Sequence, residues 1–500
     1  MDLKKLQNGS DIRGVALEGI EGQHVNLTEQ ACRDIGRGFA LWLKERLDKE
    51  SVRVAVGRDS RLSGPALCGW LCSALCEQGI HVTDIGMAST PAMFMSTVVG
   101  DRPYDASVMI TASHLPFNRN GFKFFTKDGG LEKQDIAAIL SYAQGEQVTG
   151  WAAAEVSQGT FMDEYAAILV EKVREATGEE KPLDGFKIVV DAGNGAGGFY
   201  VEKVLQPLGA DTEGSRYLDP DGSFPNHIPN PEDAQAMKAI TEAVAENQAD
   251  FGIIFDTDVD RAGAVLSDGS ELNRNRIIAM LAAILLREHP GTTIVTDSIT
   301  STGLAAFIEK HGGVHHRFKR GYRNVINEAI RLNEAGQDCQ LAMETSGHGA
   351  FKENYFLDDG AYIVTKLLIE LARGKKEGYK LESLIADLAE PAESKEFRMD
   401  IRLDDFKPYG LEVLERLEKY AAGRPGWSIA PNNFEGVRVD LDGDHGNGWF
   451  LLRMSLHDPL MPLNIESDTR GGVKTIASEL ASFLLGCDDL GTEKLADFLK

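Results

Sequence analysis

One stretch decides the fold: Phe251-Gly-Ile-Ile-Phe-Asp256-Thr-Asp258-Val-Asp260-Arg261, in which an apolar run leads directly into three alternating acids. Residues 251–255 are typical of a buried strand. Similar runs occur at residues 52–56, 187–190 and 293–296, each followed by a turn and a helical stretch. This alternation predicts α/β layers, with the starts near residues 52, 187 and 293 marking three related α/β units.

The pattern changes after residue 389. Residues 396–401, 436–441 and 449–454 are typical of antiparallel strands, a helix is expected at 475–485, and Asn447-Gly448 suits a hairpin turn. The C-terminal part is therefore expected to be a smaller α+β domain. The expected domains are residues 1–160, 161–270, 271–388 and 389–500.

Composition narrows the class of protein. The chain has 500 residues, 43% of them hydrophobic and 26% charged, which is typical of a globular protein. Its 52 Lys and Arg residues against 77 Asp and Glu residues give a formal net charge of −25, which disfavours nucleic acid as a partner. The apolar run at 277–286 is too short to cross a membrane. The N-terminus opens no signal peptide, so we expect a cytoplasmic protein, or an organellar one if a transit peptide has been removed.

The acids after residue 255 predict a cation site. Crowded carboxylates are hard oxygen ligands of the kind that Mg²⁺ and Ca²⁺ prefer. An EF-hand is excluded, since Arg261 and Ser267 stand where its Gly and Glu are required. The motif alone also allows Asp256 to be the nucleophile of a haloacid-dehalogenase-type site.

The loop Thr111-Ala-Ser113-His114 follows a strand-like run at 107–110. Adjacent Ser and His side chains point apart, so a Ser–His proton relay is disfavoured. Ser113 is instead placed to carry a phosphoryl group, and His114 and Lys123 could compensate the negative charge of that group. The sequence alone also permits an ordinary loop.

Three other segments are candidates for binding a substrate. Glu344, Ser346 and His348 either form hydrogen bonds to sugar hydroxyls or belong to an ordinary polar loop. The basic run that contains Lys319 and Arg320 is either an anion clamp or a solvated turn beside a helix. In the last domain Arg453, Ser455 and His457 form a third candidate, because Arg is the usual bidentate ligand of phosphate. This stretch alone also permits a plain loop at the end of a strand.

Taken in order, these motifs resemble the α-D-phosphohexomutase family, which includes phosphoglucomutases and phosphomannomutases. The matching segments cover nearly the whole chain: Asp11-Ile-Arg13-Gly14, Gly57-Arg58-Asp59-Ser-Arg61, Thr111-Ala-Ser113-His114 with Gly121-Phe-Lys123, Asp256-x-Asp258-x-Asp260-Arg261, and Glu344-x-Ser346-Gly-His348.

The resemblance implies three α/β domains with mixed sheets and a TATA-binding-protein-like fourth domain, arranged around a central cleft. It implies reversible 1,6-phosphoryl transfer on glucose or mannose phosphates, with Ser113 as the phosphorylated residue. Mg²⁺ would bind Asp256, Asp258, Asp260 and the phosphoserine. Arg13, His114, Lys123 and Arg261 would surround the transferred group, with glucose 1,6-bisphosphate as activator and a monomer or homodimer as the assembly.

Two loops depart from the family pattern. The usual RPSGTEP loop is Arg453-Met-Ser455-Leu456-His457-Asp-Pro459, and the third-domain loop is Arg320-Gly321-Tyr322, where the family has a small residue, Gly, and then His or Asp. An altered geometry of the phosphate site is expected. The leading hypothesis is a phosphohexomutase; the alternatives are a Mg²⁺-dependent sugar phosphatase and a non-catalytic sugar-phosphate-binding paralogue.

Overall fold

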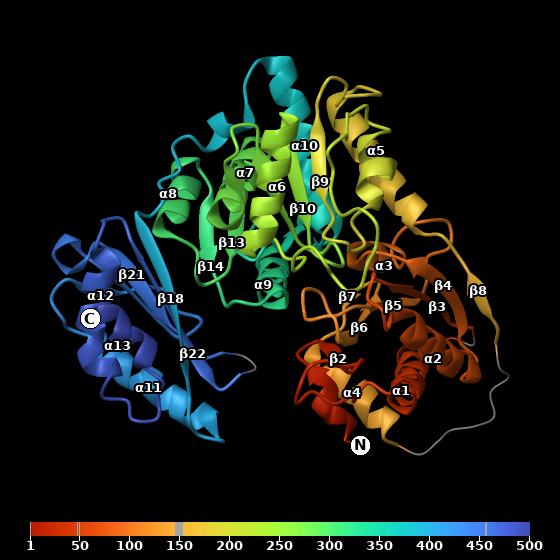
Figure 1. Cartoon of the computed structure of the whole chain (residues 1–500), viewed down its shortest axis with the longest axis horizontal. Coiled ribbons are helices and arrows are strands. Elements are labelled where there is room, and N and C mark those ends of the chain that lie inside the picture. The colour runs from red at the N-terminus through yellow and green to blue at the C-terminus, as the bar shows by residue number, and fades with distance from the viewer. Residues whose placement is uncertain (1, 48, 50, 146–153, 456–457) are drawn as a thin grey trace. The chain divides into compact units, whose positions relative to one another are not determined.

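The structure is a computed structural model that describes residues 2–47, 49, 51–145, 154–455 and 458–500. The chain divides into two compact units. The first comprises Met1–Ile277 and Ser346–Ser383, and the second comprises Ile278–Thr345 and Leu384–Lys500. Helices and strands of both units are labelled in Figure 1.

The first unit begins with a mixed sheet in the order β1-β2-β6-β5-β3-β4-β8, with β7 paired to β6. Its strands are β1 (Gln7–Asn8), β2 (Asp11–Val15), β3 (Arg53–Arg58), β4 (His81–Met87), β5 (Ala106–Ile110), β6 (Arg119–Thr126), β7 (Gly129–Gly130) and β8 (Val156–Gln158). The helices are α1 (Glu29–Leu47), α2 (Gly64–Glu77), α3 (Thr90–Met95) and α4 (Lys133–Ala143). The strand expected at 52–56 and the helical stretch expected after it are confirmed as β3 and α2.

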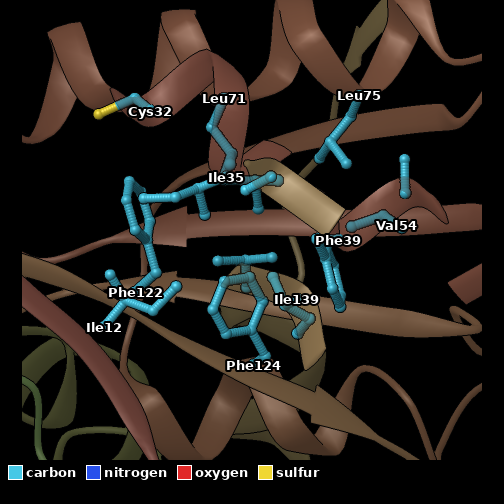
Figure 2. Close-up of a cluster of buried hydrophobic side chains, with 14 of the residues drawn as sticks. Ile12, Cys32, Ile35, Phe39, Val54, Leu71, Leu75, Phe122, Phe124 and Ile139 are labelled. Carbon is cyan, nitrogen blue, oxygen red and sulfur yellow. The ribbon is translucent and has the colours of Figure 1, made fainter. Parts of the chain in front are cut away.

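The core of this part lies between the sheet and helices α1, α2 and α4 (Figure 2). Helix α1 contributes Phe39 and strand β6 contributes Phe124, whose ring centroids are 4.6 Å apart. Both side chains are fully buried. Burial of aromatic rings of this size is a main source of stability, and it fixes the strand ends that carry the polar loops.

A second sheet completes the first unit, in the order β12-β11-β10-β9. Its strands are β9 (Ile188–Asp191), β10 (Phe251–Phe255), β11 (Ala262–Leu266) and β12 (Glu271–Leu272); β9 and β10 are parallel, and β10 and β11 are antiparallel. The first unit also contains helices α5 (Met162–Thr177), α6 (Ala234–Asn247) and α10 (Gly360–Glu377). The antiparallel pair β16 (Gly349–Phe351) and β17 (Leu357–Asp358) lies in the same unit but is not part of this sheet. Every residue of β10 is buried, as its apolar sequence predicts.

The second unit holds the parallel strands β13 (Thr293–Thr296), β14 (Val314–Arg317) and β15 (Cys339–Met343), with β13 paired to both neighbours. Helices α8 (Thr302–Lys310) and α9 (Tyr322–Glu334) follow β13 and β14. Helix α7 (Arg274–Glu288) contains the apolar run 277–286 and begins in the first unit.

The C-terminal part of the second unit is an antiparallel sheet in the order β18-β22-β21-β20-β19 (Figure 1). Its strands are β18 (Glu393–Asp400), β19 (Trp427–Ile429), β20 (Val437–Leu441), β21 (Gly448–Leu452) and β22 (Leu460–Ser467). Helices α11 (Phe406–Ala421), α12 (Gly472–Leu484) and α13 (Glu493–Leu499) share its buried core. The expected α/β domains with mixed sheets and a C-terminal sheet domain are thus confirmed.

One turn prediction is wrong in its geometry. Strands β20 and β21 are antiparallel neighbours, but Asn447-Gly448 is not a two-residue hairpin turn, because β20 ends at Leu441. The connection contains a short 3₁₀-helix, Gly443–His445, and the Asp442 side chain accepts a hydrogen bond from the Asp444 backbone. Asn447 itself has a φ of 49°, which Asn tolerates better than most residues.

Candidate active site

Ser113 lies in the loop after β5 and is almost completely buried. Its backbone is in the left-handed region, with a φ of 50°, and such strain is characteristic of functional sites. Its Oγ donates to Asp256 Oδ2 at 3.0 Å and accepts from Arg261 Nη2 at 2.8 Å. The predicted phosphoryl carrier and the predicted acidic loop are therefore in direct contact, although they are far apart in sequence.

The guanidinium of Arg61 holds the Ser113 loop in place. Its Nη1 donates to the carbonyls of Pro116 and Arg119 at 2.8 and 2.9 Å, and its Nη2 donates to those of Ser113 and Leu115. The Arg61 side chain is fully buried. A guanidinium group is planar and holds its N–H donors in fixed directions, so it can bind several carbonyl oxygens that point toward the same place.

The loop that contains Gly222 and Phe224 packs tightly against the same segment. A Cβ at Gly222 would lie 2.4 Å from the Ser60 carbonyl oxygen and 2.7 Å from the Cα of Arg61. The ring of Phe224 lies 5.2 Å from the guanidinium carbon of Arg61. Gly222 is therefore required for this close approach.

The acidic loop follows β10 and buries all three carboxylates. Ligand oxygens of Asp256, Asp258 and Asp260 all lie within 4.8 Å of one another. Within the part of the chain that the structure describes, Oδ1 of Asp258 and Oδ1 of Asp260 are buried without a hydrogen-bond partner. Buried carboxylate oxygens need compensation, so this donor set fits a hard divalent cation.

Lys123 supplies one positive charge to this cluster. Its Nζ lies 3.1 Å from Asp258 Oδ2 and also contacts Asp260 Oδ2. Burial raises the pKa of Asp256 well above its ordinary value, and the charges of Asp260 and Asp258 raise it further. Burial would also raise the pKa of Asp260, but Lys123 and the neighbouring cations hold it below its ordinary value.

Arg261 connects the acidic loop to the serine loop. Besides Ser113 it contacts Asp256 Oδ2 at 3.1 Å, His114 Nδ1 at 2.6 Å and Asn230 Oδ1 at 3.1 Å. The expectation that the Ser113 and His114 side chains point apart is wrong, because Ser113 Oγ lies 3.3 Å from His114 Nδ1. Burial, followed by the positive charge of Arg261, lowers the pKa of His114 to about 3, so His114 is neutral at physiological pH.

Arg13 lies in β2 opposite Gly121 of β6. A Cβ at Gly121 would be 3.1 Å from Arg13 Cγ and 2.2 Å from the Ile12 carbonyl oxygen, so a larger residue would displace the arginine. The Nη2 of Arg13 forms an ion pair with Asp11 at 2.9 Å. Glycine at position 121 is thus explained by the approach of the two strands.

The Ser346–His348 segment lies beside the acidic loop within the first unit. His348 pairs with Arg261 in an isolated bridge, and its Nδ1 lies 2.5 Å from Asp358 Oδ2 and 3.8 Å from Asp260 Oδ1. Burial lowers the pKa of His348, but the charges of Asp358 and Asp260 prevail and raise it to about 9. His348 therefore carries a positive charge at physiological pH. Ser346, two positions earlier in the sequence, is buried.

The remaining predicted residues lie in the second unit. Glu344 is buried and its Oε1 accepts from the Gly321 backbone N–H at 2.6 Å, at the start of α9. Lys319 Nζ lies 5.8 Å from the centre of the Phe318 ring. His457 lies outside the described residues.

Two of these residues of the second unit share a partner. The Arg320 backbone N–H donates to Glu435 Oε2 at 3.0 Å, and Arg453 Nη1 lies 3.6 Å from Glu435 Oε1. Ser455 forms a backbone hydrogen bond to Leu460 at 2.9 Å. Arg320 and Arg453 are therefore brought together through one carboxylate.

Known proteins resemble this chain along nearly all of its length. Three segments, residues 4–148, 163–269 and 273–391, match domains I, II and III of the family described as "Phosphoglucomutase/phosphomannomutase, alpha/beta/alpha". The chain belongs to the phosphoglucomutase/phosphomannomutase family. Family membership and the buried acids together indicate a site for a divalent metal.

Individual relatives support the same assignment. The phosphomannomutase/phosphoglucomutase of Pseudomonas putida is 31% identical over 478 residues, which cover 95% of this chain and 96% of that protein. The phosphoglucomutase of Neisseria meningitidis is 30% identical over 473 residues, covering 94% and 95%. A solved structure of a phosphoglucomutase/phosphomannomutase family protein from Burkholderia thailandensis has a TM-score of 0.77 and 27% identity, covering 98% of this chain and all of that one. The chain is a phosphohexomutase, an enzyme of the phosphotransferase type.

Among the described residues, no helix is both long enough and apolar enough to span a membrane. The domain boundaries at 160, 270 and 388 stay a prediction.

Sequence reasoning assigned no role to several residues that contact the site. Arg61 and Asp59 belong to the Gly57-Arg58-Asp59-Ser-Arg61 motif, so a signal was present without an indication of what they do. Asn230, Asp358 and Glu435 had no such signal, because each reaches its partner only after the chain has folded.

Proposed function

We propose that this phosphohexomutase interconverts the 1- and 6-phosphates of glucose and of mannose through a phosphoryl group carried on Ser113 Oγ. A hydroxyl of the bound sugar phosphate attacks the phosphorus, the bond from phosphorus to Ser113 Oγ breaks, and a hexose 1,6-bisphosphate forms. The 1,6-bisphosphate then reorients in the site. Ser113 Oγ attacks its other phosphoryl group, the bond from that phosphorus to the sugar oxygen breaks, and Ser113 is phosphorylated again. The contact of Ser113 Oγ with Arg261 Nη2 at 2.8 Å is the observation that carries this proposal.

The surrounding cations suit the charge that moves in this reaction. As the phosphoserine bond breaks, negative charge develops on Oγ, where the Arg261 guanidinium already donates. Positioning and electrostatic stabilisation dominate catalysis of phosphoryl transfer. Lys123, Arg13 and the charged His348 add positive charge around the transferred group in this proposal.

Lys123 and His114 are the candidates for moving the proton of the attacking hydroxyl. A pKa of about 3 makes His114 a weak base at neutral pH. Lys123, which is buried next to Asp258 and Asp260, would as an ammonium group donate a proton to the departing Ser113 Oγ. The neutral amine that this leaves would accept the proton of the attacking hydroxyl. We therefore assign the larger share of proton transfer to Lys123.

Asp256, Asp258, Asp260 and the phosphate on Ser113 would hold Mg²⁺, with the buried oxygens of Asp258 and Asp260 as further ligand atoms. A bound Mg²⁺ supplies positive charge that offsets the charge on the phosphoryl oxygens. Lys123 would then share its two carboxylates with the cation. We further propose that glucose 1,6-bisphosphate activates the enzyme by phosphorylating Ser113.

Sugar recognition is assigned to Glu344, Ser346 and His348, which suit the 3- and 4-hydroxyls that glucose and mannose share. The phosphate that does not react would bind Lys319, Arg320, Arg453, Ser455 and His457. We expect kcat/KM values for glucose 1-phosphate and mannose 1-phosphate to lie within about two orders of magnitude, since one hydrogen bond discriminates by ~1–3 kcal/mol. A preference beyond about a thousandfold would contradict a site that uses only shared hydroxyls.

One assay tests the proposal against its alternatives. The enzyme is incubated with glucose 1-phosphate and a trace of glucose 1,6-bisphosphate, and glucose 6-phosphate and free phosphate are both measured. Glucose 6-phosphate supports the mutase, free phosphate indicates a phosphatase, and neither product indicates a binding paralogue.

The variant Ser113→Ala should lose turnover by orders of magnitude and carry no phosphate in mass spectrometry. Ser107→Ala is the matched control, because Ser107 is another buried serine of the same unit and donates only to the Met93 carbonyl. Near-normal turnover in Ser113→Ala would refute the phosphoserine mechanism.

A further inference from the structure

Glu435 reaches three loops of the second unit with a single carboxylate. It lies just before β20, and the Gly436 that follows it has a φ of 64°. A Cβ at Gly436 would be 2.1 Å from the Leu452 carbonyl oxygen and 2.8 Å from Arg453 Cα. The glycine thus lets the Glu435 loop lie directly against the start of the Arg453 loop.

The two carboxylate oxygens have different partners. Oε2 accepts from Ser298 Oγ at 2.6 Å and from the Arg320 backbone N–H at 3.0 Å. Oε1 lies 3.6 Å from Arg453 Nη1, which is an ion pair and too long for a hydrogen bond. Ser298 follows β13, Arg320 follows β14 and Arg453 follows β21, so one side chain links three strand ends.

The ion pair lies in a nearly dry environment. The side chains of Glu435 and Arg453 are only 10% and 9% exposed. Within the described residues, Arg453 Nε is buried without a hydrogen-bond partner, so the guanidinium keeps a donor for a further acceptor. A phosphate is an acceptor that suits the planar guanidinium of Arg453.

We propose that Glu435 is a positioning residue, which orients Arg453 and the Arg320 loop for the unreactive phosphate of the substrate. Its negative charge also lowers the affinity of the site for that phosphate. This inference rests on the proposed function, because it takes Arg453 to be a phosphate ligand. In the empty site Glu435 compensates the buried guanidinium. Once a phosphate binds, the two anions compete for Arg453, and the competition favours release and turnover of the bound intermediate.

The variant Glu435→Gln separates the charge from the geometry. Glutamine keeps the size of the side chain and an acceptor for Ser298 Oγ and the Arg320 N–H, but it removes the charge that repels phosphate. We expect binding of inorganic phosphate to tighten on the order of tenfold, because unit charges a few ångströms apart interact strongly at a partly buried site. KM for the sugar phosphate should fall and kcat should fall with it, since release becomes slower.

Calorimetric titration of the full chain with inorganic phosphate measures the effect. The relevant component is the one that Arg453→Met removes. Glu328→Gln is the matched control, because Glu328 is also a nearly buried acid of the second unit that pairs with an arginine, Arg331 at 2.7 Å. Glu435→Asp keeps the charge and should retain an affinity closer to that of the wild type. Thermal unfolding verifies that each variant is folded.

The outcomes are distinct. Tighter phosphate binding in Glu435→Gln, with no change in Glu328→Gln, supports the inference. Weaker or unchanged binding in Glu435→Gln overturns it, and so does a phosphate affinity that Arg453→Met leaves intact. A wild-type enzyme that binds phosphate through Arg453 but forms no glucose 6-phosphate contradicts the proposed function and not the role of Glu435 in phosphate binding.

Discussion

Replacing Arg61 with lysine should disable the enzyme without touching any reacting group. The Arg61 guanidinium binds four carbonyls of the Ser113 loop, two of them through each terminal nitrogen. A lysine ammonium offers three donors from one point and cannot reach all four acceptors in their present positions. An ammonium at the position of one terminal nitrogen keeps the two carbonyls of that nitrogen, so the two hydrogen bonds of the other nitrogen should be lost in Arg61→Lys.

The cost follows from the burial of this side chain. A hydrogen bond from a charged donor contributes about 1.5–3 kcal/mol, so the loss of two lowers the free energy of unfolding by about 3–6 kcal/mol. The loop that these bonds hold contains Ser113 in its strained left-handed conformation. Misplacement of a reacting atom by about 1 Å costs about a hundredfold in rate, and we expect kcat of Arg61→Lys to fall by at least this factor.

The assay compares kcat, phosphate on Ser113 by mass spectrometry and urea denaturation for Arg61→Lys and Arg58→Lys. Arg58 is the matched control from the same motif, because its ion pair is a single 3.4 Å contact with Asp84 at a half-buried position. Arg58→Lys should remain within a few-fold of the wild type. An Arg61→Lys enzyme with wild-type kcat and stability would refute the role given to the four carbonyl contacts.

Three further predictions concern single sites. Val259 is a buried β-branched residue with a φ of 67°. Val259→Gly should be at least as stable as Val259→Ala in urea denaturation, because glycine relieves a left-handed strain of about 1–2 kcal/mol. A clearly more stable alanine variant would contradict the strain. Burial lowers the pKa of His227, but its contacts with Asp191 prevail and raise it. The stability that this pair adds should be present below pH ~6.5 and lost as the pH rises through the higher pKa of the folded state. The difference in thermal midpoint between wild type and His227→Gln should therefore shrink as the pH rises. Asp258→Asn should weaken Mn²⁺ binding, followed by electron paramagnetic resonance, by more than about tenfold, whereas Asp442→Asn, at an exposed acid, should not; equal affinities would argue against the buried acids as the metal site.

The sequence predicted those parts of the site whose residues are neighbours along the chain. Asp256, Asp258 and Asp260 alternate after an apolar strand, and Ser113 follows another strand. A strand end fixes where the next residues point, so local pattern was sufficient for both. The contact between the two loops also follows from the resemblance to the family, which combined them in one site.

The contacts that hold the site were not predictable in this way. Asp358 lies 98 positions after Asp260 in the sequence, yet both carboxylates contact the His348 imidazole. Asn230 receives a hydrogen bond from Arg261 across 31 positions. Neither residue stands in a charged run or a glycine-rich turn, so no local pattern separates them from ordinary surface residues.

The hairpin turn shows the opposite failure. Asn447-Gly448 is a strong local signal for a two-residue turn. In the structure Ser467 Oγ donates to the Gly446 carbonyl at 2.6 Å, and the Asp468 backbone N–H donates to the Asn447 carbonyl at 2.9 Å. Contacts with the end of β22 thus stabilise a longer connection, and tertiary interactions override the local preference.

The charges around Ser113 explain why the acidic loop requires a cation. Within the first unit the buried acids in mutual contact are Asp256, Asp258, Asp260 and Asp358, and the buried cations that contact them are Lys123, Arg261 and His348. The acids exceed these cations by one, 4 − 3 = 1. The raised pKa of Asp256 has this origin, because burial and two adjacent carboxylates favour its protonated form. In the proposed mechanism a phosphoryl group on Ser113 would add a further charge of about −1.5 to −2 at the same place. One proton on Asp256 cannot balance that increase, whereas a divalent cation can, so phosphorylation of Ser113 and metal binding should strengthen each other.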